Sequence, residues 1–177
     1  MRAVFATLTV LSLSFLPLAT AAHADALENL TKAETKMYEA WAKVPFSERI
    51  VTFVAQKSGG YGIYQEKQGT VFKQGEPVIT YVEPIGFGWK ELPGEMYETN
   101  FVADLVLKDD KGAVVTDQKG FVKNVLQSHN AITEFSMDFT LTLDGAPAGN
   151  YVVTYTINDI SSGEKFSFDQ DFSIAAQ

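Results

Sequence analysis

The chain has no cysteine among its 177 residues. This absence excludes a thiol nucleophile, a disulfide framework, a thiolate zinc site and a cysteine-linked lipid anchor. A folded domain of this sequence must therefore be stabilised by packing alone. The composition can supply such a core, because 46% of the residues are hydrophobic and they include 13 Phe, 7 Tyr and 2 Trp.

Histidine and basic residues are also scarce. The sequence has two His, and 14 Lys and Arg stand against 22 Asp and Glu, which gives a formal net charge of −8. An acidic surface repels nucleic acid and anionic membranes. We therefore expect no nucleic-acid partner.

Few residues are available for catalysis or metal binding. Residues 25–177 contain one histidine, His129, which stands beside Ser128 in a polar stretch. Neighbouring residues on one loop rarely aim at the same reacting atom, so a Ser-His-acid constellation is not indicated. One His without Cys cannot complete a zinc site. We expect a protein that is not an enzyme and uses no metal or cofactor; a hydrolase based on surface carboxylates such as Asp169 and Asp171 is the remaining enzymatic hypothesis.

The first 24 residues have the pattern of a secretory signal peptide. Arg2 supplies the positive start, an apolar run covers residues 4–18, and Ala22-His23-Ala24 is a small-residue cleavage site. The run is too short for a permanent membrane span. The pattern predicts cleavage before Asp25, a periplasmic protein and no stable membrane insertion.

Residues 25–45 are predicted to form one helix. Asp25 and Glu28 have the spacing of a capping box, and Pro45 ends the pattern. The residues that recur on one apolar face are Leu27, Leu30, Met37, Tyr38, Trp41 and Val44. Two alternatives follow: this face packs onto the rest of the protein, or it docks a partner.

Three amphipathic strands are predicted between residues 134 and 174. In each of them apolar and polar residues alternate with period 2, so each strand has one apolar face that another layer must cover. The apolar positions are Phe135, Met137, Phe139, Leu141 and Leu143, then Tyr151, Val153, Tyr155 and Ile157, then Phe166, Phe168, Phe172 and Ile174. This pattern favours a two-layer antiparallel sandwich.

Further strands are predicted upstream, at residues 49–55, 61–64, 78–83, 97–108, 114–115 and 120–126. Residues 50–55 are apolar at both parities, which is typical of a strand that is covered on both faces or lies in the centre of a sheet. Closely spaced short strands without alternating helices indicate an all-β fold. We expect an antiparallel β-sandwich of about eight strands over residues 46–177, preceded by one helix.

The segment Pro147-Ala148-Gly149-Asn150-Tyr151 resembles the start of the penultimate strand in immunoglobulin-like and fibronectin-type sandwiches. In those domains a tyrosine near the strand start bonds back to an upstream carbonyl. With Gly75-Glu76-Pro77 and the closing Phe172-Ser173-Ile174, the segment makes residues 61–174 similar to small exported bacterial proteins of unknown function. The resemblance implies an Ig-like fold and no particular activity.

A Gly- and Pro-rich stretch over residues 84–96 carries Phe87 and Trp89. It is either a plug folded onto the core or an exposed contact loop. Our leading hypothesis is a non-catalytic exported binding module that contacts a protein or a cell-envelope component through this loop and an exposed sheet edge. The alternative is a carrier that holds a small apolar ligand between the helix and the sandwich, lined by Tyr38, Trp41 and Tyr64.

Overall fold

The computed structural model describes residues 19–176. Residues 1–18 of the predicted signal peptide lie outside this range, and the cleavage before Asp25 stays a prediction. The chain divides into two compact units, with the boundary between Ala40 and Trp41. The first is helical and the second is built of strands.

The described part of the helical unit is helix α1 (Ala19–Trp41) without its last residue, Trp41, which belongs to the second unit. The predicted helix is confirmed, but the capping box was wrong, because Asp25 and Glu28 lie inside α1 and Glu28 pairs with Lys32. The helix ends at Trp41, before Pro45, with a turn in which the Val44 N–H bonds to the Trp41 carbonyl. Leu27 and Leu30 on α1 are more than half exposed. Within residues 19–176, no helix combines the length and the apolarity needed to cross a bilayer.

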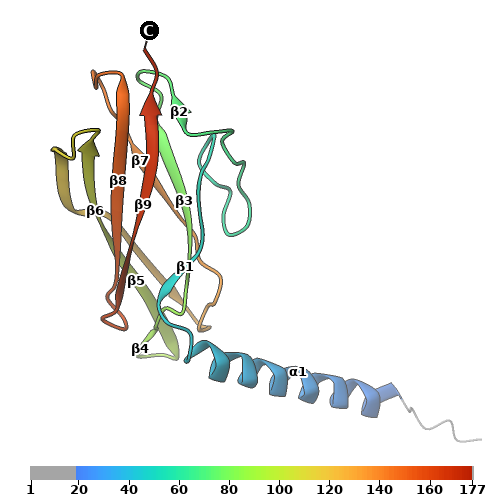
Figure 1. Cartoon of the computed structure of the whole chain (residues 1–177). Helices are drawn as coiled ribbons and strands as arrows, with labels where there is room; N and C mark the ends of the chain where they lie inside the picture. Colours follow the sequence, from blue (N-terminus) through green and yellow to red (C-terminus); the bar gives the residue numbers. More distant parts are fainter. Residues whose placement is uncertain (1–18, 177) are drawn as a thin grey trace, which may run out of the picture. The chain divides into compact units, whose positions relative to one another are not determined.

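The second unit contains every strand of the described chain (Figure 1). The strands are β1 (Ser47–Phe53), β2 (Val71–Phe72), β3 (Val78–Ile85), β4 (Lys90–Leu92), β5 (Met96–Asp109), β6 (Val114–Ser128), β7 (Met137–Leu141), β8 (Gly149–Asp159) and β9 (Lys165–Ile174). The predicted mostly-β fold with one helix is therefore confirmed.

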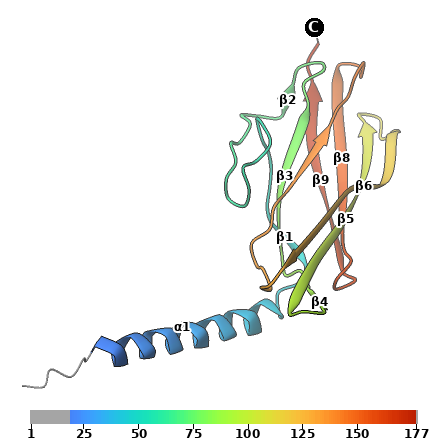
Figure 2. The ribbon, with the colours of Figure 1, turned by 180° about the vertical axis from the view of Figure 1, so that it is seen from behind.

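The strands form two sheets. One has three strands in the order β1-β3-β7, and the other has six, in the order β2-β9-β8-β5-β4 with β6 on the remaining edge of β5. Figure 2 shows β7 beside β3 from the opposite side of the unit. The larger sheet is mixed, because β2 runs parallel to β9. The expectation of purely antiparallel sheets was therefore wrong in this one pairing.

The middle strand of the small sheet is β3, and β1 is an edge strand. Of the two predictions for residues 50–55, the central strand was therefore wrong, whereas coverage on both faces agrees with the structure. The region is apolar at both parities because residues after β1 fold over the outer face of the sheet, where Val54, Ile79 and Tyr81 make a small second core. The strand predicted at 61–64 is a turn, since Gly60 and Gly62 have positive φ angles of 137° and 69°.

A single main core lies between the two sheets. Phe139 of β7 packs on Tyr155 of β8 with ring centroids 4.7 Å apart, and Phe53 of β1 packs on Phe172 of β9 at 6.2 Å. The period-2 prediction for β7, β8 and β9 is confirmed, since the apolar residues of each strand are its more buried set. Both inner faces are rich in aromatic rings.

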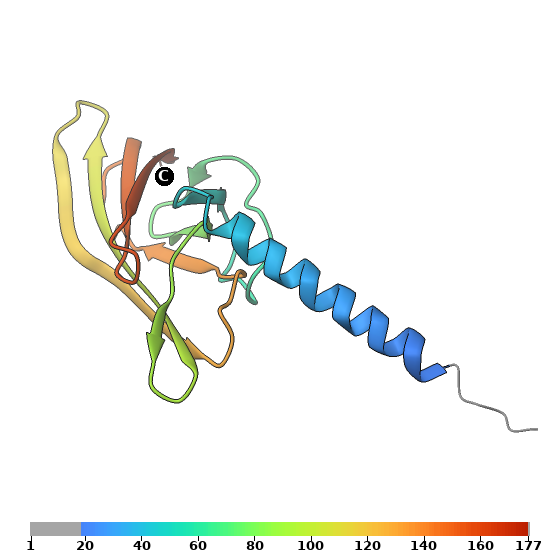
Figure 3. The ribbon, with the colours of Figure 1, turned by 90° about the horizontal axis from the view of Figure 1, so that it is seen from below.

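The β5–β6 hairpin curves strongly along its length, as Figure 3 shows. Its register shifts near Ala103 and Leu105, where β6 carries extra residues around Gly120. Gly120 has a φ of 62°, and its N–H donates to the Asp104 carboxylate at 2.8 Å. A bulge of this kind raises the local twist. The part of β6 beyond the bulge is therefore turned relative to the rest of the strand.

Candidate functional site

The structure brings three of the predicted site residues together. The ring of Trp41 stacks on Trp89 at 5.9 Å and meets Phe87 edge-on at 5.0 Å. The indole N–H of Trp41 donates to the Phe87 carbonyl at 2.8 Å, and that of Trp89 donates to the Ile132 carbonyl at 2.7 Å. Each indole therefore has a partner for its polar atom, as buried Trp requires.

This cluster favours the hypothesis that residues 84–96 form a plug folded onto the core, rather than an exposed contact loop. Phe87 is only 1% exposed and belongs to the main core, whereas Trp89 is partly buried at its margin. A partner cannot touch Phe87 while the loop keeps this conformation. Phe87 is therefore better described as a core residue than as a contact residue.

Asp159 fixes the same loop from the end of β8. Its carboxylate accepts the Gly88 N–H at 2.7 Å, the Ser161 N–H at 2.9 Å and the Ser162 hydroxyl at 2.6 Å. The residue is 1% exposed. A buried carboxylate with three donors is satisfied by the protein itself. Asp159 therefore has a structural role here, and a hollow of only about 250 Å³ remains beside Trp41 and Trp89.

Tyr64 belongs to a different part of the unit. Its ring stacks on Tyr81 at 4.3 Å, on the outer face of the small sheet. The Tyr81 hydroxyl donates to the buried Glu83 carboxylate at 2.6 Å and accepts the Gly62 N–H at 2.8 Å. Burial raises the pKa of Tyr81 to about 12, and the bond to Glu83 adds to this rise.

The residues predicted to line a carrier site thus fall into separate groups. Trp41 lies in the main core and Tyr64 packs against the second core. Tyr38 belongs to the helical unit, where it is 37% exposed. Trp41 and Tyr64 do not line a common cavity among those found in the strand unit.

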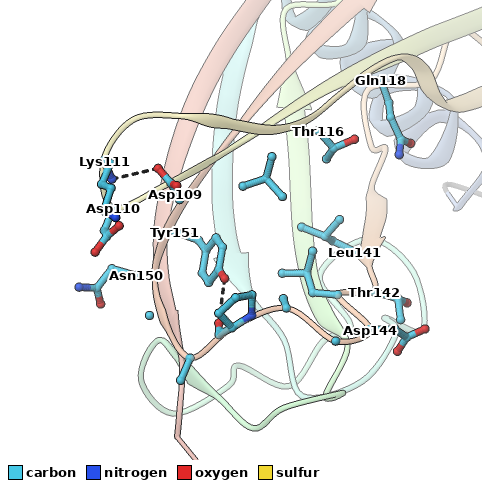
Figure 4. Close-up of a pocket in the computed structure, with 17 residues that line it drawn as sticks. Asp109, Asp110, Lys111, Thr116, Gln118, Leu141, Thr142, Asp144, Asn150 and Tyr151 are labelled. Atoms are coloured by element: carbon cyan, nitrogen blue, oxygen red, sulfur yellow. Dashed lines mark hydrogen bonds between the residues drawn. The ribbon is translucent and has the colours of Figure 1, made fainter.

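A more spacious hollow, of about 700 Å³, opens at the end of the strand unit where the β5–β6 turn lies (Figure 4). We call it the β6–β7 groove. On one side it is lined by Val115, Thr116 and Gln118 of β6. The other side is formed by Leu141 at the end of β7 and by residues 142–151, which lead into β8.

Both strands that flank the groove have an unpaired edge. Within residues 19–176, β6 pairs with β5 alone and β7 pairs with β3 alone. Thr116 and Gln118 are the register partners of Leu107 and Leu105, so they lie on the inner face of the large sheet. The buried apolar surface of this inner face therefore ends at these two polar side chains.

The walls of the groove are held by local hydrogen bonds. The Tyr151 hydroxyl donates to the Pro147 carbonyl at 2.8 Å, which is the bond expected from the resemblance. The Asp109 carboxylate accepts the Lys111 and Ala113 N–H groups at 2.9 and 2.8 Å. These three bonds fix turn residues, so the groove is formed before any ligand binds.

The rim of the groove is acidic. Asp109, Asp110 and Asp144 line it together with one cation, Lys111. A second hollow, of about 650 Å³, adjoins it on the outer face of the large sheet and is lined by Asp109, Asp110, Asp169 and Asp171. These carboxylates make no cluster of three metal-ligating side chains within residues 19–176. Asp169 accepts the Thr154 hydroxyl at 2.6 Å.

The groove could not be read from the sequence. In the local sequence the groove is marked by Val114 and Val115, two apolar residues whose exposed fractions in the structure are 59% and 51%. The groove arises because two strand edges from different sheets face each other, and such long-range pairing has no signature in one sequence.

Comparison with known proteins adds no relative. No family model matches the chain, and no curated protein matches its sequence. Its function is therefore argued from its geometry.

Proposed function

We propose that this protein is a non-catalytic, exported, immunoglobulin-like module that binds a protein or cell-envelope partner through the β6–β7 groove. The observation that carries the proposal is the preformed groove of about 700 Å³ between two unpaired strand edges. Hollows of this volume are typical of binding sites. Unpaired strand edges are typical sites of protein association.

Strand order supports the immunoglobulin-like assignment. The order β1-β3-β7 facing β9-β8-β5-β6 agrees with the A-B-E and G-F-C-C′ arrangement of that class. The bond from Tyr151 to Pro147 agrees with its tyrosine corner. The strongly curled large sheet and the parallel β2–β9 pair are departures from the common form. Export is supported by the signal-peptide pattern of residues 1–24.

Native mass spectrometry of the protein recovered gently from its own compartment tests this proposal. Two variants of β6 make a matched pair, Gln118→Lys in the groove and Gln127→Lys further along the strand, both at exposed positions. We expect a complex with a second macromolecule that Gln118→Lys abolishes and Gln127→Lys retains. A protein that carries no partner, or equal loss in both variants, would overturn the proposal.

A carrier of a small apolar ligand is the second candidate, favoured by the hollow of about 250 Å³ beside Trp41, Phe87 and Trp89. The same spectra separate it from the first. A small additional mass that leaves on mild activation and is absent from Trp89→Ala would support the carrier. Its absence from the natural protein would eliminate this candidate.

A further inference from the structure

The two sheets of the strand unit differ in width. Across the core, β1 lies against β2 and β9, because Phe53 packs on Phe72 at 5.2 Å and on Phe172 at 6.2 Å. At the other side β7 lies against β8, through Phe139 and Tyr155. The large sheet continues past β8 with β5 and β6. The small sheet stops at β7, so one strand position beside β7 is empty at the groove.

A strand added at this position would complete both layers. It would lie about 4.8 Å from β7, the spacing of hydrogen-bonded strands, and about 10 Å from the inner face of β6, the spacing of packed sheets. The groove opens at the Leu141 end of this position, with Leu141 and the residues after it on one side and Thr116 and Gln118 on the other (Figure 4). An extended peptide fits these two spacings, whereas a helix of about 10 Å diameter does not fit the first.

The edge of β7 suits pairing better than the edge of β6. Strand β6 has a bulge at Gly120 and carries Lys119 and Lys123, and both devices discourage the addition of a strand. Strand β7 is regular and has no Lys, Arg or Pro between Met137 and Leu141. An incoming segment would therefore bond to β7 and only pack against β6.

The charges of the groove indicate which kind of peptide segment would bind there. Exposed Asp110 and Asp144 line the rim. Lys111 is the single basic residue of the lining. Apolar groups from Leu141, Leu143 and Ala146 lie between these charges. A complementary segment alternates apolar side chains, which reach this lining, with basic side chains, which reach the rim.

We infer that an extended basic segment of a partner protein adds to the free edge of β7 as a fourth strand and fills the β6–β7 groove. The inference rests on the proposed function and specifies its partner. Backbone hydrogen bonds to β7 supply affinity, and the acidic rim selects for lysine or arginine.

The test uses a synthetic peptide of about nine residues that alternates lysine and valine, long enough to span a five-residue strand with overhangs. The protein is purified from its own compartment, and binding is followed by fluorescence anisotropy and by amide hydrogen exchange. We expect the amides of residues 138–142 that point away from β3 to exchange about tenfold or more slowly in the complex, because amides paired in a sheet exchange only on local opening.

Two control peptides separate strand addition from simple charge attraction. One carries methyl groups on alternate backbone nitrogens, which removes hydrogen bonding and keeps the charge; the other replaces each lysine with glutamate. We expect both to bind at least about tenfold more weakly. Equal binding of the methylated peptide, or protection of β6 in place of β7, would overturn the inference.

The variants complete the design. Gln118→Lys should weaken the lysine–valine peptide about tenfold, and Gln127→Lys should change its affinity less than about twofold. Both side chains are exposed, so neither variant should alter the unfolding temperature. If the peptide fails while the natural partner complex still depends on Gln118, strand addition is wrong and the binding function stands. If no partner complex exists, the proposed function itself fails.

Discussion

Buried polar side chains hold the loops of the strand unit in place. Glu83 is 3% exposed, and its carboxylate is retained in the fold because Tyr81 and the Gly62 N–H both donate to it. The Tyr81 hydroxyl thereby links β3 to the turn at residues 60–63. A charged group inside a protein is costly unless such donors surround it.

Replacing Tyr81 with Phe should reduce the free energy of unfolding by about 2 kcal/mol. The change removes one donor to the Glu83 carboxylate and the nearer of the two acceptors of the Gly62 N–H. Urea denaturation measures the effect. Tyr61→Phe is the control, because its hydroxyl only accepts a bond from exposed Arg49, and it should cost less than about 0.5 kcal/mol. Equal losses would show that the Tyr81–Glu83 bond does not stabilise the fold.

The same residue predicts how stability changes at alkaline pH. The folded pKa of Tyr81 is raised to about 12, above the value of about 10 in an unfolded chain. Its contribution is therefore complete below pH 10 and is lost as the pH rises through 12. Denaturation of the natural protein and of Tyr81→Phe over this window should converge. A constant difference would contradict the shift.

Asp104 predicts the opposite dependence in acid. The Gly120 N–H and, less strongly, Lys119 lower the pKa of its carboxyl below the usual value. A lowered folded pKa stabilises the protein above pH ~4 and loses this effect as the pH falls through the folded pKa. Asp104→Asn should cost about 1 kcal/mol at pH 7 and progressively less below pH 4. A difference independent of pH would refute this role.

Among the connections, that from β3 to β4 depends on a glycine for two reasons. Gly86 has a φ of 75°, and a Cβ at this position would lie 2.5 Å from the carbonyl oxygens of Val44 and Pro45. Gly94 has a similar φ of 81°, but no atom lies within 4 Å of the place its Cβ would take. The pair separates the cost of the dihedral from the cost of the clash.

Gly94→Ala should destabilise the protein by about 1 kcal/mol, from the left-handed backbone alone. Gly86→Ala should cost at least about 3 kcal/mol, because two backbone oxygens must also move. Thermal unfolding of both variants measures the difference. Similar unfolding temperatures would mean that the backbone of residues 44–45 moves aside without a loss of stability.

The sequence predicted the elements whose burial is periodic. Strands β7, β8 and β9 each bury one face, so the alternation of apolar and polar residues predicted their positions closely. Strand β6 was predicted in two pieces, at residues 114–115 and 120–126. The structure has one strand with a bulge fixed by Asp104 from β5. That contact joins residues distant in sequence, and local propensity carries no record of it.

At the scale of the whole molecule, the boundary between the two units at Trp41 indicates which residues the strand unit needs for its core. Trp41 and Phe46 are 7% and 6% exposed within its core. Phe46 packs on Phe101 at 5.8 Å and on Phe166 at 4.8 Å. The sequence placed Trp41 on the apolar face of the predicted helix and Phe46 at the start of the predicted sandwich. The partners of both rings come from distant strands and loops, which periodicity could not reveal.

A chain that begins at Ala40 should fold and unfold cooperatively, within about 1 kcal/mol of the longer chain. A chain that begins at Ser47 should lose at least about 3 kcal/mol, the cost of removing a buried aromatic side chain. Differential scanning calorimetry on the two chains tests this boundary. If both were equally stable, Trp41 and Phe46 would be dispensable to the core.

The functional hypotheses depended on the same tertiary information. Aromatic composition directed attention to Phe87, Trp89 and Trp41, and the structure places them in or against the core. The groove, by contrast, is lined by ordinary residues such as Thr116 and Gln118. Their significance comes from the ends of two sheets that differ in width. Only the three-dimensional arrangement identifies them.

The parallel pairing of β2 with β9 has a consequence for biosynthesis. Val71 and Phe72 find their partners at Ser173 and Ile174, and the Ala175 N–H bonds to the Phe72 carbonyl at 2.9 Å. An emerging chain cannot bury Phe72 in this way until residues 173–175 have been made and released. The strand unit can therefore complete its fold only once residues 173–175 are available, and its unfinished sheet needs protection from aggregation until then.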